Sequence, residues 1–256
     1  MKVMGSGVRH IFRLCVASLG DLFFPRMCLV CGSKLEMGAR HICPKCAEDI
    51  PFTYFWSWVG NPAEQRLAPA HIDEACSLFF YRRESPYSDL IHKFKYDGDI
   101  RLGRRLARML GEYMAETSAA KDGAVGEQMG PASGRFSSID AVVPVPLHPL
   151  KKFRRGFNQS DIIARELAAA LGAAFEPKLI RRRRYTRTQT RTADRRSNIA
   201  GAFVVNSRVL HRLQAAGVQR ILIVDDVLTT GSTIAAAAAV LPSSFRLSAA
   251  TLACVE

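Results

Sequence analysis

Two adjacent carboxylates, Asp225 and Asp226, stand just before a hydroxyl-rich turn, Thr-Thr-Gly-Ser-Thr. The apolar run Ile221–Val224 before them predicts a strand buried on both faces, with the acids at its carboxyl end. The alanine-rich segment Ile234–Val240 after the turn predicts a helix. A glycine with a positive φ angle and a helix amino terminus direct N–H groups and hydroxyls into one concavity, which suits phosphate. The predicted phosphate-binding residues are Thr229, Thr230, Gly231, Ser232 and Thr233.

The two carboxylates would repel a phosphate, so we expect them to bind hydroxyl groups or a divalent cation beside it. A ligand with vicinal hydroxyls next to a phosphate meets both demands. The alternative is a core strand that ends in an N-cap threonine and a solvated acid pair, but a core strand needs no such run of small polar residues. Gly-x-x-x-x-Gly-Lys-Ser/Thr is absent from the sequence, and no Gly-x-Gly-x-x-Gly follows a strand.

Four of the seven cysteines form two Cys-x-x-Cys pairs, Cys28 with Cys31 and Cys43 with Cys46, with eleven residues between the pairs. Each pair can bind one metal ion from a tight turn, and two pairs complete a tetrahedral site for Zn²⁺. Disulfides and an iron–sulfur cluster are the alternatives; disulfides would leave three cysteines over, and nothing marks the chain as secreted. Four thiolates leave no open position, so we expect a structural zinc that replaces the core of a small module.

Basic residues are concentrated in one part of the 256-residue chain. The net charge is +13, and the range 151–200 holds fourteen Lys or Arg against four Asp or Glu, a local excess of +10. A dense arginine field suits a polyanion, either a phosphorylated sugar or a nucleic-acid backbone, although a solvated surface is the plain alternative.

No segment approaches the roughly 18 apolar residues that a membrane-spanning helix needs. The early apolar segment Leu14–Gly20 is flanked by charged residues and lacks a small-residue cleavage site. It therefore favours an amphipathic helix over a signal peptide. We expect no integral membrane segment and a cytoplasmic protein.

The fold class follows from alternating strand and helix patterns. Buried strands followed by loops and amphipathic helices predict an α/β protein with an open, mostly parallel sheet and ligands at the carboxyl ends of its strands. The predicted strands cover Ile72–Tyr81, 139–143, 201–206, 218–226 and 245–254. The predicted helices cover Tyr87–Phe94, Ile100–Ala115 and Asp161–Leu171, the last capped by Ser160 or Asp161.

Two further segments have distinctive compositions. Aromatic residues crowd Pro51–Pro69; we interpret them as a hydrophobic bridge between the cysteine module and the large domain, with stacking on nucleic-acid bases as the alternative. The segment 117–138 is rich in Gly, Ala and Ser and predicts a surface loop or disordered insertion.

Short motifs follow one another along the chain: the two cysteine pairs, Lys95-Tyr96-x-Gly98-Asp99, Pro144-Val145-Pro146, Arg155-Gly156-Phe157-Asn158-Gln159 and the run 221–233. Each motif is short, but their ordered combination is specific. The acid pair and the turn resemble the 5-phosphoribosyl-1-pyrophosphate (PRPP) signature of type I phosphoribosyltransferases, and the whole motif order resembles the ComF family over roughly residues 18–256.

The resemblance implies roles for these residues. Asp225 and Asp226 would bind the ribose hydroxyls, directly or through Mg²⁺, as the catalytic acid pair, and the turn would hold the 5′-phosphate. Pro146, Arg155 and Lys95 would face the pyrophosphate. The residues implied for a mobile basic loop that closes over PRPP are Arg182, Arg184, Gln189, Arg195 and Asn198.

The resemblance also implies a division of the chain and two functions. We expect an N-terminal helix at 1–24, the zinc module at 25–62 and a phosphoribosyltransferase-like domain at 70–256. One function is transfer of a phosphoribosyl group to an undefined acceptor. The other is a non-catalytic PRPP or nucleotide sensor that binds single-stranded DNA and competence proteins. The arginines at 181–196 are expected to contact nucleic acid in addition to PRPP, and the oligomeric state stays open.

Overall fold

The computed structural model describes residues 25–36, 38–119, 134–148, 153–183 and 201–256. Five strands form one sheet in the order β1-β7-β6-β2-β3, and every neighbouring pair in it is parallel. The predicted α/β class with a mostly parallel sheet is therefore confirmed. The strands of this sheet are β1 (Ile72–Tyr81), β2 (Ala141–Pro144), β3 (Ala174–Phe175), β6 (Arg220–Leu228) and β7 (Arg246–Val255).

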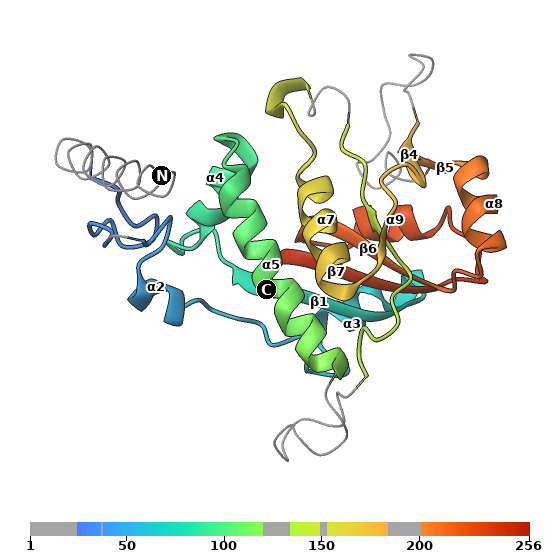
Figure 1. The fold of residues 1–256 in the computed structure, drawn as a ribbon, viewed down its shortest axis with the longest axis horizontal. Helices are drawn as coiled ribbons and strands as arrows, with labels where there is room; N and C mark the ends of the chain where they lie inside the picture. Colours follow the sequence, from blue (N-terminus) through green and yellow to red (C-terminus); the bar gives the residue numbers. More distant parts are fainter. Residues whose placement is uncertain (1–24, 37, 120–133, 149–152, 184–200) are drawn as a thin grey trace, which may run out of the picture.

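Helices cover both faces of the sheet (Figure 1). On one face α5 packs on β1 and β7, and α7 packs on β2 and β6; on the other face α3 lies on β1 and α9 lies on β6. The central strands are apolar because both of their faces are covered; Ile221–Val224 of β6 are fully buried. The helices are α2 (Pro44–Glu48), α3 (Pro62–Leu67), η1 (Ala68–Ala70), α4 (Ser88–Tyr96), α5 (Ile100–Ala119), α7 (Gln159–Leu171), α8 (Ser207–Ala215) and α9 (Ser232–Ala238). Among the helices of the described ranges, none has the length and apolar character required to cross a membrane.

A crevice forms between β2 and β6 because the chain leaves these neighbouring strands in opposite directions. β2 continues through α7 to β3 on one side, and β6 continues through α9 to β7 on the other. Pairing of β2 ends at Pro144, opposite Val224, whereas β6 stays paired with β7 as far as Leu228. Such a switch in strand order is where open α/β sheets bind ligands, and the acid pair lies directly at it.

One predicted strand does not join the parallel sheet. β5 (Phe203–Val205) pairs antiparallel with β4 (Ile180–Arg182) in a separate two-stranded sheet. Each of these strands has three residues and only one buried side chain. They cannot form a central parallel strand, which is covered on both faces. The expectation that 201–206 belongs to the parallel sheet is therefore wrong.

The composition of 117–138 predicts a surface loop, but both described ends of this segment are structured. α5 continues to Ala119. At the other end, Arg135 and Phe136 are buried, and Arg135 forms an ion pair with the buried Glu64 of α3. These ends are therefore part of the packed domain, since a buried arginine and a buried phenylalanine both require close neighbours.

Candidate functional site

The acid pair occupies the crevice at the carboxyl end of β2. Asp225 accepts hydrogen bonds from Ser160 Oγ at 3.0 Å and from the backbone N–H of Asp226 at 2.9 Å. Burial, together with the neighbouring charge of Asp226, raises the pKa of Asp225 to about 7, although both hydrogen bonds act in the opposite direction. Two carboxyl groups side by side offer the oxygen atoms that hydroxyl groups or a cation would bind.

Lys95, in the last turn of α4, faces Asp226. Lys95 Nζ lies 2.9 Å from Asp226 Oδ1, and both side chains are about one-sixth exposed, at 17% and 15%. The backbone carbonyl of Lys95 accepts a hydrogen bond from Gln159 Nε2 at 3.3 Å, and Gln159 Oε1 accepts one from Arg155 Nη1 at 3.1 Å. Gln159 thus connects both of the basic residues that the resemblance assigns to pyrophosphate.

Three buried polar residues at the start of α7 hold this arrangement. Asn158 is the N-cap residue, rather than the predicted Ser160 or Asp161. Its Nδ2 donates to the carbonyl of Val145 at 3.1 Å, which ties the helix to the chain just after β2. Ser160 cannot serve as the cap because it lies inside the helix, where its hydroxyl donates to Asp225. The first turn of α7 therefore contacts the acid pair through Ser160, in addition to forming the start of the helix.

Ser160 and the acid pair line one cavity of about 480 Å³. The pyrophosphate-facing residues of the resemblance, Lys95, Arg155 and Pro146, lie in its wall together with the acid pair. Arg182 also lines it, with its guanidinium 5.3 Å from the centre of the Phe203 ring, and burial lowers the pKa of Arg182. Aromatic side chains complete one wall: Tyr81, His92 and Tyr96.

The hydroxyl-rich turn contributes to two sides of the structure. Thr229 and Thr233 line the cavity with the acid pair, whereas Thr230, Gly231 and Ser232 line a separate shallow hollow. Gly231 has a φ angle of 78°, as the sequence predicts, and precedes α9 as its N-cap. The hydroxyl of Thr230 donates to Ser232 Oγ at 3.0 Å and accepts from the Ser232 N–H at 3.4 Å. The described conformation thus brings only the two outer threonines to the acids.

Arg66 of α3 donates hydrogen bonds to the backbone at the turn, and this contact was not predicted from the sequence. Its Nη1 donates to the carbonyls of Thr229 at 2.7 Å and Val255 at 2.9 Å. A side chain at Gly231 would meet Leu67 Cδ2 at 2.7 Å, so α3 also limits the size of the turn residue. No local signal could reveal Arg66, because it precedes its partner by 163 residues.

The predicted basic loop is described only at its start. Arg181 and Arg183 are exposed, and Arg182 between them turns into the cavity, as alternation along β4 requires. The other predicted loop residues lie outside the described residues: Arg184, Gln189, Arg195 and Asn198.

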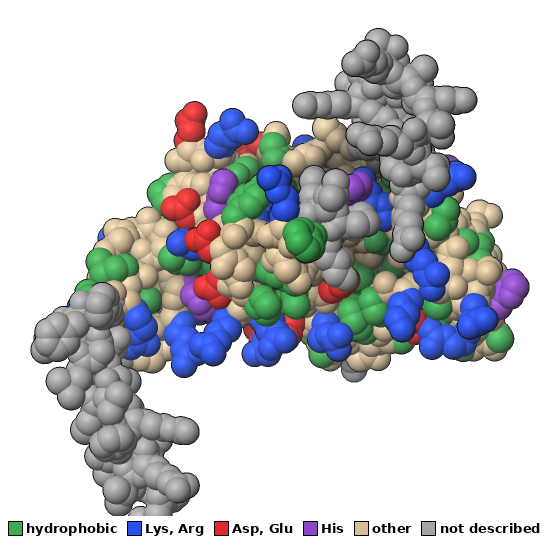
Figure 2. Space-filling view, turned by 90° about the horizontal axis from the view of Figure 1, so that it is seen from above, with side chains coloured by type: hydrophobic (Ala, Val, Ile, Leu, Met, Phe, Trp, Pro, Cys, Tyr) green, Lys and Arg blue, Asp and Glu red, His purple; other side chains and the backbone are tan. Residues whose placement is uncertain are grey.

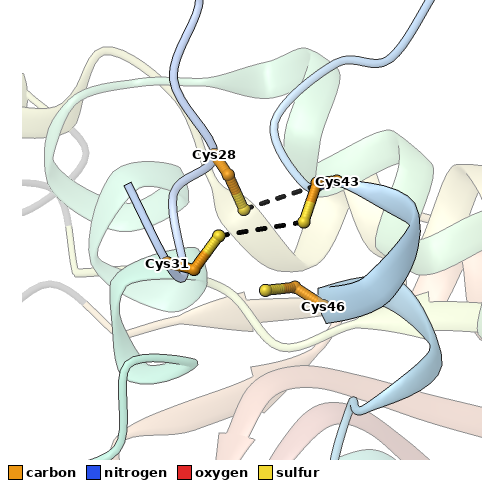
Figure 3. A group of neighbouring side chains, drawn as sticks. All are labelled: Cys28, Cys31, Cys43 and Cys46. Atoms are coloured by element: carbon orange, nitrogen blue, oxygen red, sulfur yellow. Dashed lines mark hydrogen bonds between the residues drawn. The ribbon is translucent and has the colours of Figure 1, made fainter. Parts of the chain in front are cut away.

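The four cysteines of the two Cys-x-x-Cys pairs converge in the N-terminal module. Their Sγ atoms all lie within 4.8 Å of one another and point toward a common centre (Figure 3). Cys31 Sγ lies 3.8 Å from Cys43 Sγ, and the N–H of Cys43 donates to Cys28 Sγ at 3.4 Å. Four sulfurs from two tight turns fit tetrahedral Zn²⁺ with no position left for a substrate. The site is therefore structural.

Side-chain contacts attach this cysteine module to the helices of the α/β domain. Tyr87 Oη donates to the carbonyl of Cys46 at 3.0 Å, and His41 Nε2 lies 3.1 Å from Asp99 Oδ2. Arg105 of α5 donates to the carbonyl of Arg40. The module consequently packs against the start of α4 and against α5.

The fold and the two sites define a parallel α/β protein with an acid-pair cavity and a four-cysteine module. The range 19–56 matches a family described as "Double zinc ribbon domain". "Competence protein F" of Haemophilus influenzae is 30% identical over 212 residues, which cover 81% of this chain and 74% of that protein. "DNA utilization protein YhgH" of Salmonella typhi is 34% identical over 225 residues, 84% of this chain and 89% of the relative. Its Escherichia coli K12 counterpart is 31% identical over 216 residues, 82% and 81% of the two chains.

The chain belongs to the ComF family, whose members competence protein F and DNA utilization protein YhgH match it over most of their length. The resemblance expected from the motif order is thereby confirmed. The double zinc ribbon match and the convergence of the four cysteines support a structural Zn²⁺ in the N-terminal module.

Proposed function

We propose that the cavity between β2 and β6 binds PRPP and that the protein transfers or senses phosphoribosyl groups. The observation that carries this proposal is the meeting of Asp225 and Asp226 with Lys95, Arg155 and the outer turn threonines in one cavity. A sugar with vicinal hydroxyls between two phosphate groups matches that alternation of acidic and basic walls. In this arrangement Asp225 and Asp226 bind the ribose hydroxyls, and the turn binds the 5′-phosphate.

The basic residues of the cavity serve the pyrophosphate. Gln159 bonds both the Arg155 guanidinium and the backbone carbonyl of Lys95, so Arg155 is held next to the turn of α4 that carries Lys95. Arg182 adds a third positive charge from β4. Transfer breaks the bond between C1′ and the pyrophosphate oxygen and forms a bond from C1′ to an acceptor nitrogen, which loses a proton. Because the leaving group gains negative charge, these cations stabilise the transition state more than the ground state.

Magnesium fits the donor set of the acid pair. Mg²⁺ prefers carboxylate and phosphate oxygens, and Asp225 and Asp226 offer two neighbouring carboxylates; burial first, and the charge of Asp226 second, raise the pKa of Asp225. A bound Mg²⁺ would neutralise charge on the pyrophosphate as it leaves. The chain's own part is to hold the two carboxylates together, through Ser160 on one side and Lys95 on the other.

The relatives' names associate the chain with competence and DNA utilization. We infer that it serves the handling of single-stranded DNA during uptake, with competence proteins as partners, in a reducing compartment such as the cytoplasm, which suits zinc-bound thiolates. A non-catalytic sensor of PRPP or a nucleotide, which binds single-stranded DNA as an adaptor of the DNA-uptake machinery, is the second candidate. The exposed Arg181 and Arg183 beside the cavity favour it, because they supply cations beyond those that line the ligand site.

Calorimetry with PRPP and Mg²⁺ tests the site. Asp225→Asn combined with Asp226→Asn should weaken PRPP binding by about 2–4 kcal/mol, because charge-assisted hydrogen bonds are lost. Asp97→Asn is the matched control, since Asp97 lies on the exposed end of α4 and pairs with Lys93. Equal PRPP affinity in the wild type and the double variant would refute the site.

Pyrophosphate release distinguishes the two candidate functions. PRPP, Mg²⁺ and a panel of bases and amines are mixed with the protein, and free pyrophosphate is measured. Release with a particular acceptor establishes the transferase. Binding of PRPP without release across the panel favours the sensor.

A further inference from the structure

The wall of the acid-pair cavity changes from charged to uncharged along the edge of the sheet. Where β6, β7 and β1 end, the lining residues are Val227, Val255 and Tyr81 in that order. Tyr81 and Val255 are partners in the pairing of β1 with β7, so the two residues adjoin one another. These three side chains carry no charge that could attract a phosphate. A ligand that extends from the acid pair toward β1 therefore meets an apolar surface.

Two aromatic side chains of α4 line the same cavity. His92 and Tyr96 lie one helical turn apart, with their ring centres 5.5 Å from each other, and both line the cavity. Positions 92, 95 and 96 share one face of the helix. Because Lys95 on this face contacts Asp226, the two rings lie within one helical turn of the residue that reaches the acid pair.

The ring of Tyr96 is open to solvent. Tyr96 is 63% exposed, although it lines a cavity. The Arg155 guanidinium lies 4.9 Å from the centre of the ring and occupies one of its two faces. The exposed surface leaves room for a planar group to stack on the ring, as aromatic pairs do.

A polar edge lies beside this ring. Tyr81 Oη and His92 Nε2 lie 3.4 Å apart. A hydroxyl and an imidazole can each donate and accept hydrogen bonds, so together they suit ring nitrogens and carbonyl oxygens. A hydrocarbon ring would leave these groups without partners, which is unfavourable. The edge therefore favours a nitrogen heterocycle.

The uncharged side of the cavity also adjoins the phosphate turn. Arg66 Nη1 donates to the carbonyl of Val255 at 2.9 Å and to that of Thr229 at 2.7 Å, which holds the end of β7 next to the start of the turn. A ligand held by both the acid pair and the turn consequently has the aromatic side next to each of its two anchors.

We propose that this side of the cavity binds the heterocyclic base of a nucleoside 5′-monophosphate, stacked on Tyr96 and hydrogen-bonded at its edge by Tyr81 and His92. The inference rests on the proposed function, because the ribose and the 5′-phosphate take the positions proposed for the same groups of PRPP. In the transfer reaction the same site holds the acceptor. Its ring nitrogen forms the bond to C1′, the bond from C1′ to oxygen breaks, pyrophosphate leaves with the electron pair, and the ring N–H proton passes to water.

Calorimetry with ribose 5-phosphate and with the 5′-monophosphates of adenosine, guanosine, cytidine and uridine measures the contribution of the base. Figure 2 shows Lys and Arg side chains gathered in a row along the lower edge of that view, so any phosphate is attracted to the protein. Ribose 5-phosphate carries this attraction without a base, and it lacks the pyrophosphate that Arg155 is proposed to bind. At least one of the nucleotides should bind the wild type about tenfold more tightly than ribose 5-phosphate does.

Tyr96 separates base stacking from attraction to the phosphate. Tyr96→Ala should weaken binding of the preferred nucleotide about tenfold and leave ribose 5-phosphate unchanged, because only the stacked base is lost. Tyr96→Phe should keep the nucleotide affinity, since stacking needs the ring and not the hydroxyl. Tyr54→Ala is the matched control and should change neither ligand, because Tyr54 is similarly exposed, at 56%, but does not line the cavity.

Two results would overturn the base site. One is a wild-type protein that binds ribose 5-phosphate as tightly as every nucleotide. The other is a Tyr96→Ala variant that keeps the nucleotide preference or loses affinity for both ligands equally. Binding of PRPP to the wild type is measured alongside. PRPP binding without a nucleotide preference refutes the base site alone, whereas a nucleotide preference that depends on Tyr96, without PRPP binding, refutes only the PRPP proposal.

Discussion

Lys95 Nζ lies 2.9 Å from Asp226 Oδ1, although the two residues come from α4 and β6 and are separated by 131 positions in the chain. The ion pair places a cation of the proposed pyrophosphate site on a carboxylate of the proposed ribose site. A ligand that binds both must replace this contact with one between Lys95 and phosphate. The proposed ligand would therefore compete with this ion pair.

Lys95→Met should have opposite effects on two ligands. It removes the cation that competes for Asp226, so binding of Mg²⁺ alone should tighten. It also removes a phosphate partner, so binding of PRPP with Mg²⁺ should weaken by about 1–3 kcal/mol. Calorimetry with each ligand measures both effects. Lys93→Met on the same helix is the control, since Lys93 pairs with the exposed Asp97 and should change neither. Weakening of both ligands would contradict the competition.

Asp225 should make the free energy of unfolding depend on pH. Burial and the charge of Asp226 raise its pKa from 3.8 to about 7 in the folded protein, so between about pH 4 and 7 the folded state holds a proton that the unfolded state has lost. The stabilisation is complete at acid pH and falls as pH rises through that window. Asp225→Asn should remove this slope and should raise the free energy of unfolding at pH 8 by about 1–3 kcal/mol. Urea denaturation at several pH values measures it, and parallel curves for both proteins would contradict it.

Gly231→Ala should destabilise the phosphate turn. Its Cβ would meet Leu67 Cδ2 at 2.7 Å, and the φ angle of 78° is itself unfavourable for alanine. Gly217→Ala is a matched control, because Gly217 has a φ angle of 75° and open space around it. Both variants should lose about 1 kcal/mol to backbone strain. Gly231→Ala alone should lose more and should also bind PRPP more weakly. Thermal unfolding measures the loss of stability, and calorimetry measures the PRPP affinity. Identical results for both variants would show that the Leu67 side chain moves aside and makes room for the added methyl group.

Zinc removal should unfold the cysteine module while the parallel sheet persists. The module has few buried apolar residues of its own, so the metal supplies most of its folding energy. Cys28→Ser should lower the zinc content, whereas Cys254→Ala should leave it unchanged, since Cys254 lies on β7. Metal analysis under reducing conditions measures both. Native amide exchange in 28–46 after chelation would contradict a folding role.

The sequence by itself determined the local chemistry of the protein. The run 221–233 contains the apolar strand, the acid pair and the turn in direct succession. Their neighbouring positions in the chain were therefore enough to predict that they lie together. The spacing of the two Cys-x-x-Cys pairs likewise predicts a four-cysteine metal site. The alternation of strands and helices was enough to predict a parallel α/β sheet. A continuous apolar run such as Ile221–Val224 is typical of a strand that is buried on both faces.

Only the tertiary structure decided which distant residues meet these motifs. Arg66 reaches the carbonyl of Thr229, and Ser160 donates to Asp225, through contacts between elements whose separation in the chain gives no periodic signal. The short strand β5 pairs with β4 outside the main sheet. It has only one buried residue, which suits a two-stranded sheet, and this pairing depends on β4 rather than on the sequence of β5 alone. The cysteine module lies beside α5 because Arg105 bonds the carbonyl of Arg40 and Asp99 pairs with His41. Local propensity fixes elements, but the packing of their faces fixes which side chains share a site.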